Sequence, residues 1–156
     1  MTHNPGRQIA AAALLALFAP LSWAQAGHHM MSDADKLSWA AVPSLPKGAQ
    51  ITVLEGPMNE AVPFTARIKF PANFQIPPHW HPAIEHVTVL SGTFNMGTGD
   101  SFDRSKTQAL NAGGFAVMPT QTRHFAWTAT ETVIQVHGVG PWGLTYVNPT
   151  DDPRAK

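Results

Sequence analysis

Hydrophobic residues in most of the chain occur in short runs that are separated by turn residues. These runs are rich in Val, Ile, Thr and aromatic residues, which favour β-strands, and they cover residues 51–54, 64–70, 85–90, 94–96, 115–118, 124–129, 132–139 and 144–147. Turn-forming pairs such as Ser91-Gly92, Gly113-Gly114 and Gly140-Pro141 lie between them. No stretch of about ten residues shows the period of an amphipathic helix. The pattern predicts an all-β domain, either an antiparallel barrel or a jelly roll.

The beginning of the chain carries a different pattern. Arg7 stands before the largely apolar residues 9–23, and Ala24-Gln25-Ala26 offers the small residues that a signal peptidase recognises. A membrane anchor is the alternative, but the apolar run is shorter than the roughly 20 residues that span a bilayer. We therefore expect a signal peptide over residues 1–26, with cleavage after Ala24 as a second possibility. The mature protein is then periplasmic or secreted.

We expect the remaining chain to consist of an N-terminal arm (27–48), a barrel (49–150) and a C-terminal tail (151–156). Ten basic residues balance ten acidic residues, and there is no Cys. The balanced charge leaves no basic surface for nucleic acid, and we expect no membrane contact after signal cleavage. Without Cys, the chain has no disulfides, no thiolate zinc site and no cysteine nucleophile. Histidine stands out instead, with eight copies.

The residues with the clearest chemistry lie in the segment 77–92. On a strand, His79 and His81 point to the same face while Trp80 points away. Glu85 begins the next extended run and can turn onto that face. Two imidazoles and a carboxylate form an open set of ligands for a divalent first-row metal, such as Fe, Mn, Ni, Cu or Zn. A fourth ligand must come from elsewhere, and His124, which follows a turn, is the candidate.

The spacing of these residues resembles that of the cupin superfamily. Its first motif is similar to His79-x-His81-x3-Glu85-x6-Gly92, and its second to Gly113-x5-Pro119-x4-His124. The resemblance implies a cupin-type double-stranded β-helix with a metal held by His79, His81, Glu85 and His124. Three positions differ from the motifs: Asn73 and Gln121 replace usual glycines, and Thr128 replaces a usual asparagine. The whole mature chain resembles small secreted single-domain cupins.

Several other residues remain candidates for the site. Arg123, Gln135 and His137 are candidate substrate residues, although His137 is also readily explained as a hydrogen-bonded structural histidine. His86 should face away from Glu85 and is more simply a surface group. Cleavage after Ala26 would create the terminus Gly27-His28-His29, whose amine, backbone nitrogens and imidazole can bind Cu(II) or Ni(II). The alternative is a solvated tail with two histidines.

Two functional classes remain open, both with a small molecule as partner. The first is a metal-dependent enzyme, dioxygenase-like or isomerase-like, in which Glu85 doubles as ligand and catalytic base. The second is a non-catalytic protein that binds or senses a metal or small ligand. Alternation also places Trp80, Phe125 and Trp127 on outer faces. These aromatics need a cover, either from the arm with Trp39 or from a second subunit, and we therefore predict a homodimer.

Overall fold

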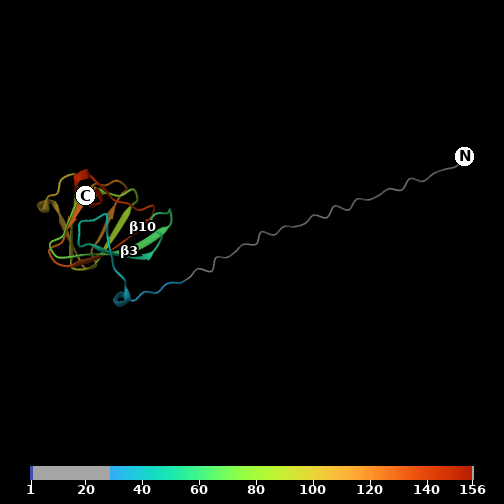
Figure 1. The fold of residues 1–156 in the computed structure, drawn as a ribbon, viewed down its shortest axis with the longest axis horizontal. Coiled ribbons are helices and arrows are strands. Elements are labelled where there is room, and N and C mark those ends of the chain that lie inside the picture. Colours follow the sequence, from blue (N-terminus) through green and yellow to red (C-terminus); the bar gives the residue numbers. More distant parts are fainter. Residues whose placement is uncertain (2–28, 156) are drawn as a thin grey trace. The chain divides into compact units, whose positions relative to one another are not determined.

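The computed structural model describes Met1 and residues 29–155. The predicted signal peptide and His28 lie outside these residues, apart from Met1, and the segment Ser32–Lys156 forms one compact unit (Figure 1). Among the described residues, no helix is long and apolar enough to cross a membrane. Helical structure there is restricted to short 3-10 turns, namely η1 (Ala34–Lys36), η2 (Arg104–Lys106), η3 (Pro149–Asp151) and η4 (Pro153–Ala155).

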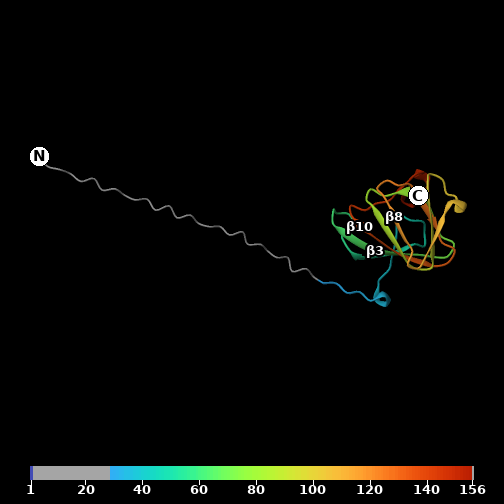
Figure 2. The ribbon, with the colours of Figure 1, turned by 180° about the vertical axis from the view of Figure 1, so that it is seen from behind.

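Two antiparallel sheets make up the compact unit, as the all-β prediction requires (Figures 1 and 2). The six-stranded sheet has the order β1 (Ala40–Ala41), β2 (Gln50–Glu55), β3 (Pro63–Phe70), β10 (Thr132–Val139), β5 (Glu85–Ser91) and β8 (Phe115–Met118). The five-stranded sheet has the order β11 (Thr145–Tyr146), β4 (Gln75–Trp80), β9 (His124–Trp127), β6 (Thr93–Thr98) and β7 (Gln108–Asn111). No pairing joins one sheet to the other among the described residues. The fold is therefore a two-sheet jelly roll, and the barrel is not closed.

Alternation along the strands builds the core between the sheets. In β3, Phe64, Ala66, Ile68 and Phe70 are buried, while the residues between them are half-buried or exposed. Phe70 stacks on Phe94 of the opposite sheet, with ring centroids 5.4 Å apart. Apolar side chains of both sheets thus interdigitate, and the site described below lies in the same interior space.

The hydrophobic pattern does not predict three of the strands, of which β1 is only two residues long. β4 contains Pro77 and Pro78, which read as a turn because proline cannot donate to a strand ladder. The ladder between β4 and β9 is in fact irregular between Ile76 and His79, where the prolines lie. β7 is missed for another reason, since only Leu110 of its four residues is buried. The other predicted runs lie at strands, with ends that differ by a few residues.

The outward aromatics are covered differently from the prediction. Phe125 is 1% exposed and packs against Phe102, with ring centroids 5.4 Å apart. Trp127 lies under Arg104, and its Nε1 donates to the Thr107 hydroxyl at 3.2 Å. The cover for these two side chains is thus the segment 102–107, not the N-terminal arm. Trp39 of the arm packs under Lys69 of the other sheet instead.

This packing gives a stability prediction. Phe125→Ala should lower the free energy of unfolding by about 3–5 kcal/mol, because it leaves a cavity under the 102–107 segment. Val139→Ala is the control, since Val139 is 57% exposed and should change stability by only about 0.5 kcal/mol. Urea unfolding followed by tryptophan fluorescence measures both variants. Equal losses would contradict the assignment of Phe125 to the packed interior.

Candidate metal centre

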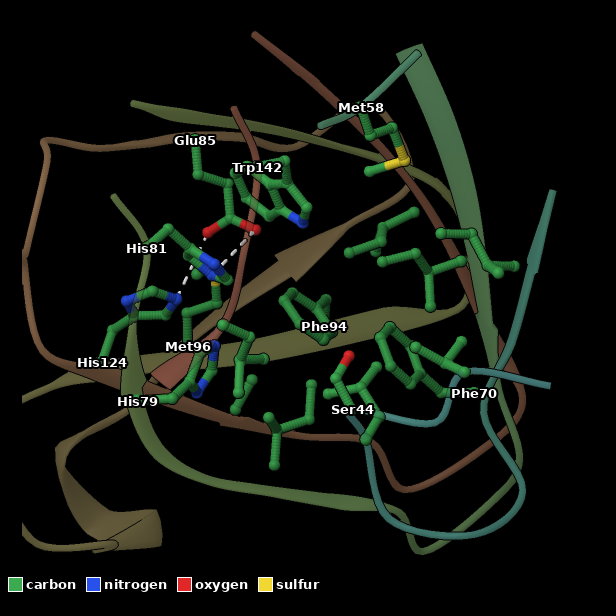
Figure 3. Close-up of a pocket in the computed structure, with 18 residues that line it drawn as sticks. Ser44, Met58, Phe70, His79, His81, Glu85, Phe94, Met96, His124 and Trp142 are labelled. Carbon is green, nitrogen blue, oxygen red and sulfur yellow. Dashed lines mark ion pairs between the residues drawn. The ribbon is translucent and has the colours of Figure 1, made fainter. Parts of the chain in front are cut away.

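Three histidines and one glutamate converge between the two sheets (Figure 3). His79 in β4 and His124 at the start of β9 are partners in neighbouring strands, and His81 follows directly after β4. Glu85 is the first residue of β5 and so comes from the opposite sheet. All four side chains are buried. The structure thus brings together the four residues that the motif spacing selected.

The distances between these side chains are those of a compact ligand set. One nitrogen from each of His79, His81 and His124 lies within 4.8 Å of the others. Glu85 Oε1 is 3.7 Å from His81 Nε2, and Glu85 Oε2 is 3.2 Å from His124 Nε2. The carboxylate therefore faces the imidazoles and completes a group of three nitrogens and one carboxylate.

Backbone carbonyls orient each imidazole. The Nδ1 atom of His79 lies 2.8 Å from the Pro77 carbonyl, that of His81 lies 2.7 Å from the Gly143 carbonyl, and that of His124 lies 2.8 Å from the Thr122 carbonyl. A carbonyl only accepts hydrogen bonds, so each Nδ1 carries the proton and donates it. Each Nε2 is then left with a free lone pair. Histidines that bind metals in proteins are held in this way.

Two atoms of the group show why a metal ion fits here. His81 Nε2 and Glu85 Oε2 are fully buried without a hydrogen-bond partner among the described residues. Oε2 lies 3.2 Å from His124 Nε2, close enough for an electrostatic contact. A buried polar atom without a partner costs free energy. A divalent cation at this point would satisfy both atoms with ligand types that first-row metals accept.

Burial and mutual contact shift the pKa values of the four groups. Burial, with the nearby His124 and His81, holds the pKa of His79 well below its usual value. Burial also lowers the pKa of His81. Burial alone would lower the pKa of His124, but the adjacent Glu85 carboxylate raises it overall. Burial would likewise raise the pKa of Glu85, yet His124 and His81 lower it overall. The His79 and His81 side chains are therefore neutral near neutral pH, and Glu85 is a carboxylate.

The motif departures preserve the shape of the turns. Asn73 and Gln121, which stand where cupins usually have glycine, both adopt a left-handed backbone, with φ of 58° and 61°. The backbone N–H of Gln121 donates to the His81 carbonyl at 2.9 Å, so this turn also anchors the segment that carries a ligand. The turns that precede His79 and His124 are thus formed without glycine.

A cavity of about 120 Å³ opens next to the four residues. Its other walls are mostly apolar and come from both sheets and from the arm, namely Val42, Ser44, Leu45, Ile51, Met58, Ile68, Phe70, Ile76, Phe94, Met96, Ala126, Ile134, Trp142 and Leu144. His79, His81, Glu85 and His124 form one side of it (Figure 3). A small molecule in this cavity would contact the candidate metal site directly.

The three predicted substrate residues do not line this cavity. Arg123 is at the surface, paired with Asp100 at 2.6 Å. Gln135 accepts a hydrogen bond from Arg67 at 3.3 Å, and the His137 ring stacks on His86 with centroids 4.8 Å apart. His29 is exposed, and its role in a terminal metal site stays a prediction.

Sequence reasoning missed two contributors to the site. The Trp142 ring stacks on the His81 imidazole, with centroids 4.0 Å apart and planes 17° apart. The arm contributes a wall through Val42, Ser44 and Leu45. Tyr146 ties the arm down, because its hydroxyl donates to the Ser44 carbonyl at 2.8 Å. No local sequence pattern predicts these contacts, because the segments that make them are far apart in the chain.

The pKa directions predict how metal binding depends on pH. Because the pKa of His124 is raised above 6.5, binding a metal near pH 6 must displace about one proton from this residue. The apparent affinity should therefore rise about tenfold per pH unit until pH exceeds the pKa of His124. Calorimetric titration with Zn²⁺ in buffers of different ionisation enthalpy measures the released proton. Affinity independent of pH between 5.5 and about 6.5 would contradict the assignment of His124 as a ligand.

Comparisons with known proteins agree with this architecture. The chain is 36% identical over 85 residues to germin-like protein subfamily 1 member 1 of Arabidopsis thaliana, which covers 54% of this chain and 38% of the relative. It thus spans well under half the length of this curated relative. The polyketide cyclase RemF of Streptomyces resistomycificus superposes with a TM-score of 0.67 at 17% identity, covering 81% of this chain and 91% of the cyclase. A putative acetylacetone dioxygenase of Methylibium petroleiphilum superposes with a TM-score of 0.61 at 19% identity, covering 81% of this chain and 85% of that chain.

The family profile described as the ChrR cupin-like domain matches residues 27–142. This match includes both ligand-bearing segments and most of the two sheets. It confirms the cupin resemblance that the motif spacing carried. The chain belongs to the ChrR cupin-like domain family.

Proposed function

We propose that this protein is an exported, metal-dependent enzyme of the dioxygenase-like or isomerase-like kind, acting on a small organic molecule. The observation that carries the proposal is the convergence of three free Nε2 atoms and the Glu85 carboxylate on one side of a mainly apolar cavity. His79, His81, Glu85 and His124 would hold a divalent transition metal. A structural site would instead use its full coordination for protein ligands.

Each part of the chain has a separate task in this proposal. A bound metal would supply Lewis acidity or redox chemistry with oxygen. The backbone carbonyls fix the direction of the imidazoles, and the apolar walls exclude water from the bound molecule. The buried Glu85 carboxylate would accept a proton from the substrate at the oxygen that does not hold the metal, and then return it.

The second candidate is a non-catalytic cupin that binds or senses a metal or small ligand. The contacts of Glu85 with His81 and His124 favour this candidate. A carboxylate that is engaged by both histidines would hold the site together and would not be free to act as a base. A single experiment separates the two. Protein loaded in turn with Fe(II), Mn(II), Ni(II), Cu(II) and Zn(II) is mixed with phenolic, enediol and β-diketone compounds, and both oxygen uptake and product formation are followed.

Turnover with one of these metals supports an enzyme, and its absence with tight ligand binding supports the second candidate. Elemental analysis of protein purified from its native compartment identifies the metal. A native protein that contains no metal and binds none of the five metals would contradict the enzyme, and one that also binds none of the small molecules would contradict the second candidate.

Export and dimerisation are also part of the proposal. N-terminal sequencing of the native protein tests the signal peptide, and a terminus at Gly27 is expected. The homodimer no longer depends on Phe125, which the chain itself covers. Exposed apolar side chains at Phe115 and Val117 of the edge strand β8 support it instead. Light scattering that shows a monomer at micromolar concentration would count against a dimer.

A further inference from the structure

The cavity beside the metal site has an unequal distribution of polar groups. Apart from the four candidate ligands, its walls contain no acidic or basic side chain. Arg123, which adjoins His124 in the sequence, pairs with Asp100, and Arg67 donates a hydrogen bond to Gln135. A charged group on the part of a ligand remote from the metal would therefore be buried without a partner, at a cost of several kcal/mol.

One hydroxyl group interrupts the apolar walls. Ser44 lines the cavity on the side away from the histidines and Glu85, and its side chain turns toward the interior (Figure 3). Its backbone carbonyl accepts the Tyr146 hydroxyl hydrogen bond, but its own hydroxyl makes no side-chain hydrogen bond within the described residues. The hydroxyl is therefore available to a ligand.

The position of Ser44 is coupled to that of the metal site. Tyr146, which holds the Ser44 carbonyl, pairs with His79 between β11 and β4, and the two rings lie 6.2 Å apart. The turn around Ser44 is further fixed by the hydrogen bond from the Leu45 N–H to the Val42 carbonyl at 3.1 Å. One residue thus anchors both ends of the cavity, and the hydroxyl stands at a fixed separation from the metal ligands.

The size of the cavity limits what fits between these two ends. Its volume is about 120 Å³, and an engineered cavity of roughly 150 Å³ in another protein accepts benzene. A single six-membered ring or a chain of similar size fills such a space, whereas two rings do not.

We propose that the cavity takes a compact molecule with an uncharged apolar body, a metal-binding oxygen at one end and a hydrogen-bonding group at the other, which the Ser44 hydroxyl meets. This inference rests on the proposed metal site and names the class of its substrate. Ser44 would thus determine the specificity of the cavity for the bound molecule. It acts on the remote end of the molecule, whereas the metal ligands act on the reacting end.

Binding of four matched phenols to the full chain loaded with Co(II), under anaerobic conditions, tests the proposal through the visible spectrum of the cobalt. Phenol provides the metal-binding oxygen and the ring, and hydroquinone adds a hydroxyl at the remote end. 4-Hydroxybenzoate adds a carboxylate there, and 4-phenylphenol adds a second ring. We expect hydroquinone to bind about 3–10-fold more tightly than phenol, as one hydrogen bond allows. 4-Hydroxybenzoate should bind at least about 100-fold more weakly than phenol, because its carboxylate would be buried without a partner. 4-Phenylphenol should also bind more weakly than phenol, because its second ring exceeds the volume of the cavity.

Variants locate the effect. Ser44→Ala should abolish the preference for hydroquinone and leave phenol binding unchanged, whereas the exposed Ser101→Ala should keep the preference. Equal affinity for phenol and hydroquinone in the wild type, a preference that survives in Ser44→Ala, or tight binding of 4-hydroxybenzoate would each overturn the proposal. Failure of the chain to bind cobalt would overturn the proposed function itself. Cobalt-loaded protein that selects these ligands without any turnover would support the present inference and count against an enzyme.

Discussion

His81→Ala should remove most of the metal from the protein. The substitution deletes one of three imidazoles whose nitrogens lie within 4.8 Å of one another, and it also leaves the Gly143 carbonyl and the Trp142 ring without their contacts. Removal of a group that hydrogen-bonds to a metal-binding side chain already weakens metal binding by about 10–100-fold. Loss of the ligand itself should therefore cost more than about 100-fold in affinity.

His137→Ala is the matched control for this experiment. It removes the same kind of side chain from the same fold, but the His137 ring stacks on His86 and does not line the cavity. Metal content by elemental analysis and affinity by competition with a chromophoric chelator should match those of the wild type. Equal metal content in His81→Ala and His137→Ala would contradict the four-residue site, provided that both variants show the wild-type circular dichroism spectrum.

Glu85→Gln should abolish turnover while the protein keeps its fold. The amide has nearly the same shape as the carboxylate, but it carries no charge and cannot act as a base near neutral pH. General-base catalysis contributes about 10²–10⁴-fold to rate, so kcat should fall by at least about 100-fold. The pKa of His124 should fall as well, because Glu85 is what raises it. Metal affinity should therefore lose part of its dependence on pH.

The exposed Glu131→Gln is the control for Glu85→Gln, since it also removes one negative charge. Rates are compared at full metal loading, which separates loss of metal from loss of chemistry. Retained turnover in fully loaded Glu85→Gln would show that Glu85 serves as a ligand without a role as base. Loss of metal without a change in rate per bound metal would lead to the same conclusion.

The sequence predicts two of the candidate ligands because strand alternation is a local property. His79 and His81 share a face whatever the rest of the chain does, and the same rule shows why Arg123 is misplaced. As the immediate neighbour of a buried ligand, Arg123 turns outward, where it meets Asp100. Sequence adjacency to His124 thus argues against a place in the cavity.

Strand alternation does not predict which residues form the walls of the cavity. Ser44 reaches its place through a hydrogen bond to Tyr146, 102 residues away in the chain. Trp142 reaches His81 from the segment after β10. Both contacts depend on how two sheets and an arm pack together, and side-chain periodicity carries no information about partners at such separations. Phe125 illustrates the same point, since the segment that covers it is polar in pattern.

The two-sheet origin of the ligands has a mechanical consequence. The histidines belong to the five-stranded side and Glu85 to the six-stranded side, and no hydrogen-bonded strand pairing joins these sides in the described residues. A bound ion would act as a clasp across the jelly roll. Amide hydrogen exchange should therefore slow on both β4 and β5 when metal is added, because opening the sandwich then also requires the ion to leave.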